Sequence, residues 1–256
     1  MAQAQDSKVV LVTAGSAGLG AAVVKALAAA GQYRIVVNYS SNRERAEDLI
    51  KEIEKAYPSS FSSTRFAAIQ ADVSKRDEII RLVEKTVSTM GRLDAIVSNA
   101  GWTRFSNFLD LDESVVESDW DKCFNMNVKS HLFLMHAAKK HLEATEGAFL
   151  LTASTAGVIP AGSSMAYSVS KAAEIHLMKC LAKSTGPRIR VNSVSPGLML
   201  TDWGLQFPQE QINAYKEQTK LKSIPAVEDV AQQVLCFIQN RSITGANIVI
   251  DSGYTV

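Results

Sequence analysis

The chain of 256 residues lacks most features that mark secreted or metal-binding proteins, and its cysteines are the clearest example. Its three cysteines, Cys123, Cys180 and Cys236, are odd in number and far apart, and none belongs to a CxxC pair. Disulfide frameworks and zinc sites use even numbers or close spacings of cysteine. We therefore expect free thiols in a reducing compartment.

Long hydrophobic runs are also missing. No apolar stretch approaches the ~20 residues that span a bilayer. The polar start, residues 1–8, lacks the apolar segment of a secretory signal. These absences predict a cytoplasmic protein with no membrane partner.

The chain has little net charge and no metal-binding motif. Its 27 basic and 26 acidic side chains give a formal charge of +1, so no nucleic-acid partner is expected. His131, His136 and His141 lie five residues apart, a spacing that does not align them on one helix face. The H-E-x-x-H motif is absent as well, and we expect no metal site.

Short apolar runs alternate with longer amphipathic stretches along the whole chain. Several runs are apolar on both faces, which is typical of a parallel sheet covered by helices on each side. Strands are expected at 8–13, 34–38, 66–70, 93–97, 148–152, 190–194 and 247–251, and helices at 19–30, 43–57, 75–90, 119–142, 163–183 and 227–239. The alternation predicts an α/β fold, a Rossmann-like doubly wound parallel sheet of about seven strands.

No repeat or linker interrupts this pattern, so we expect a single domain over residues 1–256. Residues 58–64 are polar and predict an exposed loop. Residues 198–225 carry mixed signals and follow a strand end. Long segments of this kind often close over a ligand, so we expect a substrate lid at about 198–225.

A glycine-rich turn, Thr13-Ala-Gly-Ser-Ala-Gly-Leu-Gly20, connects the first strand to the first helix. Gly15, Gly18 and Gly20 would bring backbone N–H groups and a helix N-terminus to a pyrophosphate without side chains in the way. The position after the first strand of a parallel sheet is where dinucleotides bind. The turn therefore predicts a nucleotide site.

The end of the second strand indicates which dinucleotide binds. An NAD site usually has a carboxylate there for the ribose hydroxyls, and this strand end has none. Ser40, Ser41, Asn42 and Arg43 instead offer donors and a cation to a 2′-phosphate. NADP(H) is therefore preferred over NAD(H), although Arg43 could simply begin a solvated helix.

Tyr167 and Lys171 lie four residues apart in Ala166-Tyr-Ser-Val-Ser-Lys171 and share one helix face. A neighbouring cation favours tyrosinate and lowers the phenol pKa, which suits proton transfer near neutral pH. By itself this pair is a weak signal. Ser154 upstream and the glycine turn give it weight.

Together these residues resemble the short-chain dehydrogenase/reductase family, of the single-domain classical kind, over nearly the whole chain. Thr13 to Gly20 resembles its glycine turn, with Ala14 in place of the first glycine. The terminal Asp251-Ser252-Gly253 also departs from the family's Asp-Gly-Gly.

The resemblance implies an NADP(H)-dependent oxidoreductase that moves hydride between the nicotinamide and a carbonyl, imine or alcohol. It implies that Ser154 polarises the substrate oxygen and Tyr167 is the general acid/base. Lys171 lowers the tyrosine pKa and binds the ribose, and Asn127 holds a water beside it.

The resemblance, with the turn and strand end above, also implies the set of residues that bind the cofactor. These are Gly15, Ser16, Gly18, Leu19, Gly20, Asn38, Ser40, Ser41, Asn42, Arg43, Asp72, Val73, Asn99, Ala100, Gly101, Tyr167, Lys171, Pro196, Gly197, Met199 and Thr201.

The loops expected to face the substrate are apolar and aromatic. Trp102, Arg104, Ile159, Met165 and Trp203 are the substrate residues we expect. Such a pocket suits a hydrophobic ketone, quinone, cyclic imine or polyketide-like intermediate.

Two other functions stay open: an NADP-binding regulatory protein, and an isomerase or dehydratase on the same fold. A homodimer or homotetramer, packed through the helices at 119–142 and 163–183, is implied by the resemblance alone.

Overall fold

Seven parallel strands form one sheet in the order β3-β2-β1-β4-β5-β6-β7 in a computed structural model that describes residues 7–58 and 64–256. The strands are β1 (Lys8–Val12), β2 (Tyr33–Tyr39), β3 (Phe66–Gln70), β4 (Ala95–Ser98), β5 (Ala148–Thr152), β6 (Arg190–Pro196) and β7 (Asn247–Ile250). Each lies within two residues of its predicted range. Most of the polar loop predicted at 58–64 falls outside the described residues.

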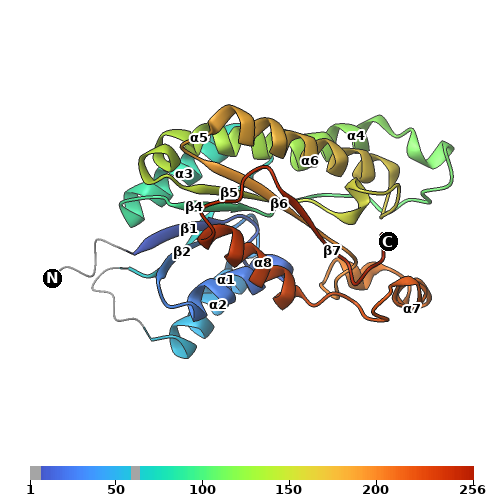
Figure 1. The fold of residues 1–256 in the computed structure, drawn as a ribbon, viewed down its shortest axis with the longest axis horizontal. Helices are drawn as coiled ribbons and strands as arrows, with labels where there is room; N and C mark the ends of the chain where they lie inside the picture. Colours follow the sequence, from blue (N-terminus) through green and yellow to red (C-terminus); the bar gives the residue numbers. More distant parts are fainter. Residues whose placement is uncertain (1–6, 59–63) are drawn as a thin grey trace.

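Helices cover both faces of the sheet, so the predicted doubly wound α/β fold is confirmed (Figure 1). The helices are α1 (Gly18–Ala29), α2 (Arg43–Ala56), α3 (Arg76–Met90), α4 (Glu117–Phe124), α5 (Ser130–Thr145), α6 (Met165–Thr185), α7 (Gln209–Gln218) and α8 (Val227–Gln239). α1, α2 and α8 lie on one face, and α3 to α6 lie on the other.

The core has two apolar layers because side chains alternate across each strand. In β1, Val10 and Val12 pack into the layer under α1 and α8. Val9 and Leu11 pack into the layer under α3, α5 and α6. All four side chains are fully buried, which explains why the run is apolar on both faces.

The predicted helix over 119–142 is interrupted in the structure. A π-helical stretch, Asn125–Lys129, separates α4 from α5. The apolar periodicity continues through this stretch, so sequence spacing alone does not reveal the wider turn. Such π-bulges occur frequently at functional sites, and this one carries Asn127.

Strand order reverses between β1 and β4, which are neighbours although they are far apart in the chain. In open parallel sheets this reversal opens a crevice at the carboxyl ends of the strands. The segment 198–225, with a short 3-10 turn at Gly204–Gln206 and helix α7, lies at that end, opposite the N-terminus (Figure 1).

Candidate active site

The glycine turn after β1 is packed so closely that larger residues would not fit. A Cβ on Gly20 would lie 2.3 Å from the backbone oxygen of Ala14, and one on Gly15 would lie 2.9 Å from that of Val12. The Gly15 N–H donates to the Asn38 carbonyl at 2.9 Å. The turn thus leads into the N-terminus of α1, whose first residues, Gly18 to Ala21, are small or apolar.

Asn99 ties the turn to the middle of the sheet. Its side-chain Nδ2 donates to the carbonyl of Thr13 at 3.2 Å, and its backbone N–H donates to Thr13 Oγ1 at 2.8 Å. Its Oδ1 accepts from Thr152 Oγ1 at 3.1 Å. One side chain therefore holds the carboxyl ends of β1, β4 and β5 together.

A cavity of about 270 Å³ opens between these strand ends and the segment 198–225. It is lined by Ala14, Ala17, Gly18, Leu19, Asn99, Gly101, Thr152, Ala153, Ser154, Tyr167, Lys171, Pro196, Gly197, Met199, Thr201, Asp202 and Trp203. Ten of the predicted cofactor residues are in this set. A helix N-terminus without acidic side chains, opening on this cavity, fits a pyrophosphate-containing cofactor.

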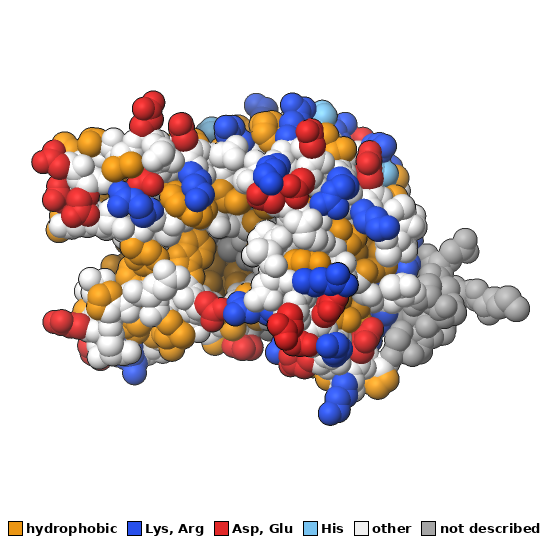
Figure 2. All heavy atoms as spheres, turned by 180° about the vertical axis from the view of Figure 1, so that it is seen from behind, with side chains coloured by type: hydrophobic (Ala, Val, Ile, Leu, Met, Phe, Trp, Pro, Cys, Tyr) orange, Lys and Arg blue, Asp and Glu red, His pale blue; other side chains and the backbone are white. Residues whose placement is uncertain are grey.

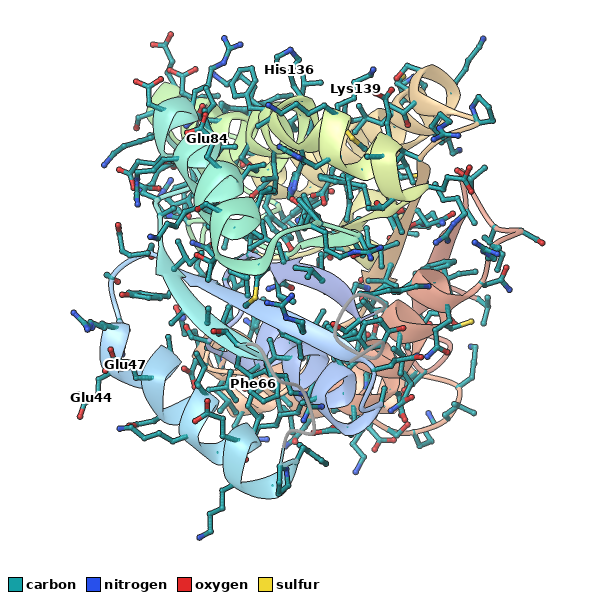
Figure 3. The ribbon with its side chains drawn as sticks, turned by 90° about the vertical axis from the view of Figure 1, so that its left-hand side faces the viewer. Glu44, Glu47, Phe66, Glu84, His136 and Lys139 are labelled. Carbon is teal, nitrogen blue, oxygen red and sulfur yellow. The ribbon has the colours of Figure 1, made fainter. Side chains whose placement is uncertain are left out.

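The predicted 2′-phosphate residues are exposed at the end of β2 and the start of α2. Arg43 donates to Glu47 at 2.7 Å, and Figure 3 shows Glu44 and Glu47 on the outer side of α2. Arg45 reaches across the cleft to Asp202 at 2.8 Å. No local sequence pattern predicts this contact, because its two residues lie 157 positions apart.

Asn38 and Asp72 have mainly structural contacts. Asn38 is buried and donates to the carbonyls of Ile69 and Ala71 while accepting from the N–H of Ala14. Although burial opposes it, hydrogen bonds from Ser74 and the nearby Lys75 hold the pKa of Asp72 below its ordinary value. These residues shape the crevice at the carboxyl ends of β2 and β3.

Ser154 and Tyr167 meet because the turn after β5 packs directly on α6. Gly157 permits this contact, since a Cβ there would lie 2.5 Å from the Lys171 backbone. Ser164 caps α6 by accepting from the Tyr167 N–H at 3.2 Å. The Lys171 Nζ lies 5.7 Å from the Tyr167 ring centroid. The structure therefore brings together the predicted serine, tyrosine and lysine.

The proton affinity of Tyr167 departs from the simple expectation. Burial raises the pKa of Tyr167 above its ordinary value, and Lys171 and a hydrogen bond with Ser154 offset only part of this effect. Lys171 acts in the expected direction, but the net shift is upward. A raised pKa keeps the phenol protonated at neutral pH, as a proton donor requires.

Asn127 is fully buried in the π-helical stretch and forms hydrogen bonds with the loop after β4. Its Oδ1 accepts from the Trp102 N–H at 2.7 Å, and its Nδ2 donates to the Trp102 carbonyl and to Ser170 Oγ, each at 2.9 Å. These contacts fix the loop that carries Gly101. The water predicted beside Asn127 stays a prediction.

A second cavity, of about 380 Å³, adjoins the first and shares Ser154 and Tyr167 with it. The segment 198–225 lines it with three aromatic side chains, Trp203, Phe207 and Tyr215, and Tyr254 near the C-terminus adds a fourth. Figure 2 shows the molecule hollowed at this end, with hydrophobic side chains inside the cleft.

Only one of the five predicted substrate residues lines either cavity. Trp203 lines both and contacts the Tyr167 ring edge-on, with centroids 5.9 Å apart. Arg104 instead pairs with Asp119, and the Trp102 ring lies under Lys122. Met165 and Ile159 lie outside both linings. Sequence order placed these residues near the site, but Arg104 and Trp102 contact α4 instead.

Tyr215 and Tyr254 are the clearest residues that sequence reasoning missed. Their rings stack with centroids 4.3 Å apart, and Tyr215 Oη accepts from the Leu198 N–H at 3.2 Å. Burial raises the pKa of Tyr215 to about 12. Gly197 lets the phenol approach, because a Cβ there would lie 2.1 Å from it.

Within residues 7–58 and 64–256, no group of three or more His, Cys, Asp or Glu side chains could hold a metal ion. Over the same residues, none of the helices combines the length and apolar character needed to cross a bilayer.

Comparison with known proteins adds independent evidence. A family model described as Enoyl-(Acyl carrier protein) reductase matches residues 13–255. Versicolorin reductase stcU of Emericella nidulans is 35% identical over 208 residues, which cover 81% of this chain and 75% of that protein.

Two solved structures share the fold over almost the full length. A short-chain dehydrogenase from Burkholderia cenocepacia J2315 in complex with NADP has a TM-score of 0.86 and 32% identity, covering 99% of this chain and 100% of that one. The NADPH-dependent 3-quinuclidinone reductase from Rhodotorula rubra has a TM-score of 0.87 and 26% identity, covering 99% and 93%. Together with the sheet order and the glycine turn, these matches show that the chain belongs to the short-chain dehydrogenase/reductase family of oxidoreductases.

Proposed function

We propose that this oxidoreductase is an NADP(H)-dependent carbonyl reductase with Tyr167 as the general acid. One observation carries the proposal: Ser154 and Tyr167 lie at the boundary between two cavities. One cavity has the glycine turn and helix N-terminus of a dinucleotide site, and the other is lined by uncharged side chains, several of them aromatic. A carbonyl at that boundary would meet both the cofactor and the proton donor.

The chain's own groups supply binding and proton transfer, and NADPH, when bound, supplies the hydride. Ser154 donates a hydrogen bond to the substrate oxygen and stabilises its developing negative charge. Tyr167 then donates its phenolic proton to that oxygen. Lys171, which lines the dinucleotide cavity, stabilises the resulting tyrosinate.

The preference for NADP(H) rests on the end of β2. Arg43 and Arg45 begin α2, and the side chains from Ser40 to Asn42 are uncharged. A 2′-phosphate would find cations there and would meet no carboxylate at the strand end. The similar structures described above as an NADP complex and an NADPH-dependent reductase agree with this choice.

The second cavity favours a neutral, hydrophobic cyclic substrate. Every side chain in its lining is uncharged, and four aromatic rings in addition to Tyr167 are among them. Gln211 and Gln218 add hydrogen-bonding groups at the side formed by α7. Aromatic or polycyclic ketones and quinones fit this lining better than sugars or small acids.

The test is to follow NADPH oxidation with a panel of polycyclic ketones, quinones, cyclic imines and aliphatic ketones. Tyr167→Phe should still bind NADPH but lose at least about a hundredfold in kcat, because it removes the proton donor. Tyr57→Phe, at the end of α2, is the matched control and should leave kcat unchanged.

Turnover that survives in Tyr167→Phe would refute the assigned role. NADPH that binds without being consumed by any member of the panel would favour the regulatory alternative. Substrate conversion without net NADPH oxidation would favour an isomerase or dehydratase.

A further inference from the structure

Lys171 has a buried acidic partner that the proposed proton transfer has not yet used. Glu174 follows Lys171 by one helical turn, and its side chain is 0% exposed. Its Oε2 accepts from Lys171 Nζ at 2.7 Å. The same Nζ donates to the Thr152 carbonyl at 2.7 Å. Two of the three ammonium donors are therefore held by the protein.

A histidine from another helix stands behind Glu174. His131 of α5 is also 0% exposed, and its Nε2 lies 3.4 Å from Glu174 Oε1. On the other side of the ring, Nδ1 lies 2.6 Å from Ser98 Oγ at the end of β4. Among the described residues, His131 Nε2 and Glu174 Oε1 are buried polar atoms that face each other with no hydrogen-bond partner. These four side chains thus form a buried side-chain network that ends at Tyr167: Ser98, His131, Glu174 and Lys171.

Burial largely determines the charge states of the groups in this side-chain network. It raises the pKa of Glu174 to about 7, with Lys171 opposing the shift. Burial, with Lys171 adding to the effect, lowers the pKa of His131 to about 3, so the ring is neutral at pH 7. The pKa of Lys171 lies above its ordinary value, since Glu174 and Tyr167 stabilise the ammonium more than burial disfavours it.

The side-chain network can exist in two protonation states that differ by one proton, and every polar group in it has a partner in both. With Glu174 ionised, the His131 Nε2–H donates to Oε1, and Nδ1 accepts from the Ser98 hydroxyl. When one proton enters from water, Glu174 becomes a carboxylic acid that donates to Nε2. His131 is then protonated on Nδ1, which donates to Ser98 Oγ. The net change is one proton gained and one negative charge lost beside Lys171.

We infer, on the basis of the proposed role of Tyr167, that Glu174 is a positioning residue which sets how much positive charge Lys171 presents to the phenol. As a carboxylate, Glu174 neutralises Lys171 and keeps Tyr167 a weak acid. As a carboxylic acid hydrogen-bonded to His131, it leaves the Lys171 charge uncompensated and makes Tyr167 a stronger acid.

Other titratable groups around this side-chain network do not mask the effect of Glu174 on Tyr167. The Cys123 thiol of α4 also acts on Tyr167 and Lys171, but burial raises the pKa of Cys123 to about 11 and keeps it neutral at pH 7. Asp119, also on α4, acts on Cys123 and is itself paired with Arg104. Ser98 and Thr152 contribute only neutral contacts from β4 and β5.

The direct test is a spectrophotometric titration of the phenol, which needs no substrate. The tyrosinate signal of Tyr167 is the difference between the full chain and its Tyr167→Phe variant, and the same difference is taken in a Glu174→Gln background. Glutamine keeps an acceptor for Lys171 but carries no charge. We expect Tyr167 to ionise at a pH lower by about one unit. Glu84→Gln, on the outer surface of α3 (Figure 3), should leave the midpoint unchanged.

Kinetics give a second readout, once a substrate is found. The wild-type pH profile of kcat should show an inflection near neutral pH, which Glu174→Gln should abolish. His131→Phe removes the group that faces Glu174 and should displace that inflection, whereas His136→Phe, on the exposed face of α5 (Figure 3), should not. These variants distinguish an electrostatic effect of Glu174 on Tyr167 from a purely structural role of Glu174.

The inference and the proposed function can fail separately. If folded Glu174→Gln leaves the Tyr167 midpoint unmoved, or if His131→Phe leaves the inflection in place, the inference is overturned even when Tyr167 proves essential. If the midpoint moves but Tyr167→Phe retains full turnover, the charge coupling is supported and the proposed function falls.

Discussion

Ala14 adopts a backbone conformation that glycine tolerates more easily. Its φ is +48°, in the left-handed region, where a Cβ costs roughly 1–2 kcal/mol. The turn imposes this conformation, because the Ala14 N–H donates to Asn38 Oδ1 at 3.2 Å and its carbonyl faces Gly20. The departure from the family's glycine at this position is therefore a local strain in an otherwise intact turn.

Ala14→Gly should relieve that strain. The gain is reduced by the greater freedom of glycine in the unfolded chain, about 0.5–1 kcal/mol, so we expect a stabilisation of up to about 1 kcal/mol. Ala22→Gly, in the regular part of α1, should instead destabilise by about 0.5–1 kcal/mol. Denaturant unfolding measures whether each variant has a higher or lower free energy of unfolding than the wild type. A destabilised Ala14→Gly would contradict the strain argument.

At the scale of elements, the site depends on contacts between segments with little regular structure. The segment 198–225 meets the glycine turn at Thr201, whose side chain lies 3.3 Å from a Cβ built on Gly18. It also meets α2 through the bridge between Arg45 and Asp202. Gly18, Thr201 and Asp202 all line the cavity beside the glycine turn, so we expect ligand binding there and the position of this segment to depend on each other.

The two arginines of α2 should have different effects on cofactor choice. Arg43→Ala should weaken NADPH binding about tenfold or more while changing NADH binding little, because it removes a charge-assisted contact with the 2′-phosphate. Arg45→Ala loses the bridge to Asp202 and should affect both dinucleotides alike. Equal losses of NADPH and NADH in Arg43→Ala, measured by equilibrium titration, would count against a phosphate contact.

For the whole molecule, the exposed apolar residues on α5 and α6 agree with the predicted subunit packing. Leu132 of α5 is 41% exposed and Val169 of α6 is 42% exposed. The two helices lie on the same side of the sheet (Figure 1). A homodimer or homotetramer would cover them, and that assembly, like the cytoplasmic location, stays a prediction.

Leu132→Glu should therefore dissociate the assembly, because a buried carboxylate at a subunit interface would be left unpaired. Light scattering after gel filtration measures the mass directly. Ile80→Glu, on α3 at a similar exposure of 40%, is the matched control and should keep the wild-type mass. A wild-type chain that is monomeric at all concentrations would refute the predicted assembly.

The sequence by itself determined the fold class, the strand positions and the candidate residues Ser154, Tyr167 and Lys171, because these depend on local patterns. Apolar alternation marks a buried strand wherever it occurs, and the glycine turn and the Tyr167–Lys171 spacing each lie within one short segment. The π-helical stretch at Asn125–Lys129 escaped prediction because helical spacing in the sequence does not reveal its wider turn.

Only the tertiary structure decided which distant side chains share the site. Tyr254 stacks on Tyr215, Arg45 reaches Asp202, and His131 lies behind Glu174. Trp102 and Arg104 follow the end of β4 in sequence, yet they contact Lys122 and Asp119 of α4. The direction of a side chain and the partner it meets are set by the packing of whole elements, which no local pattern encodes. For the same reason the proton affinity of Tyr167 depends on burial and on Glu174 as well as on its neighbour Lys171.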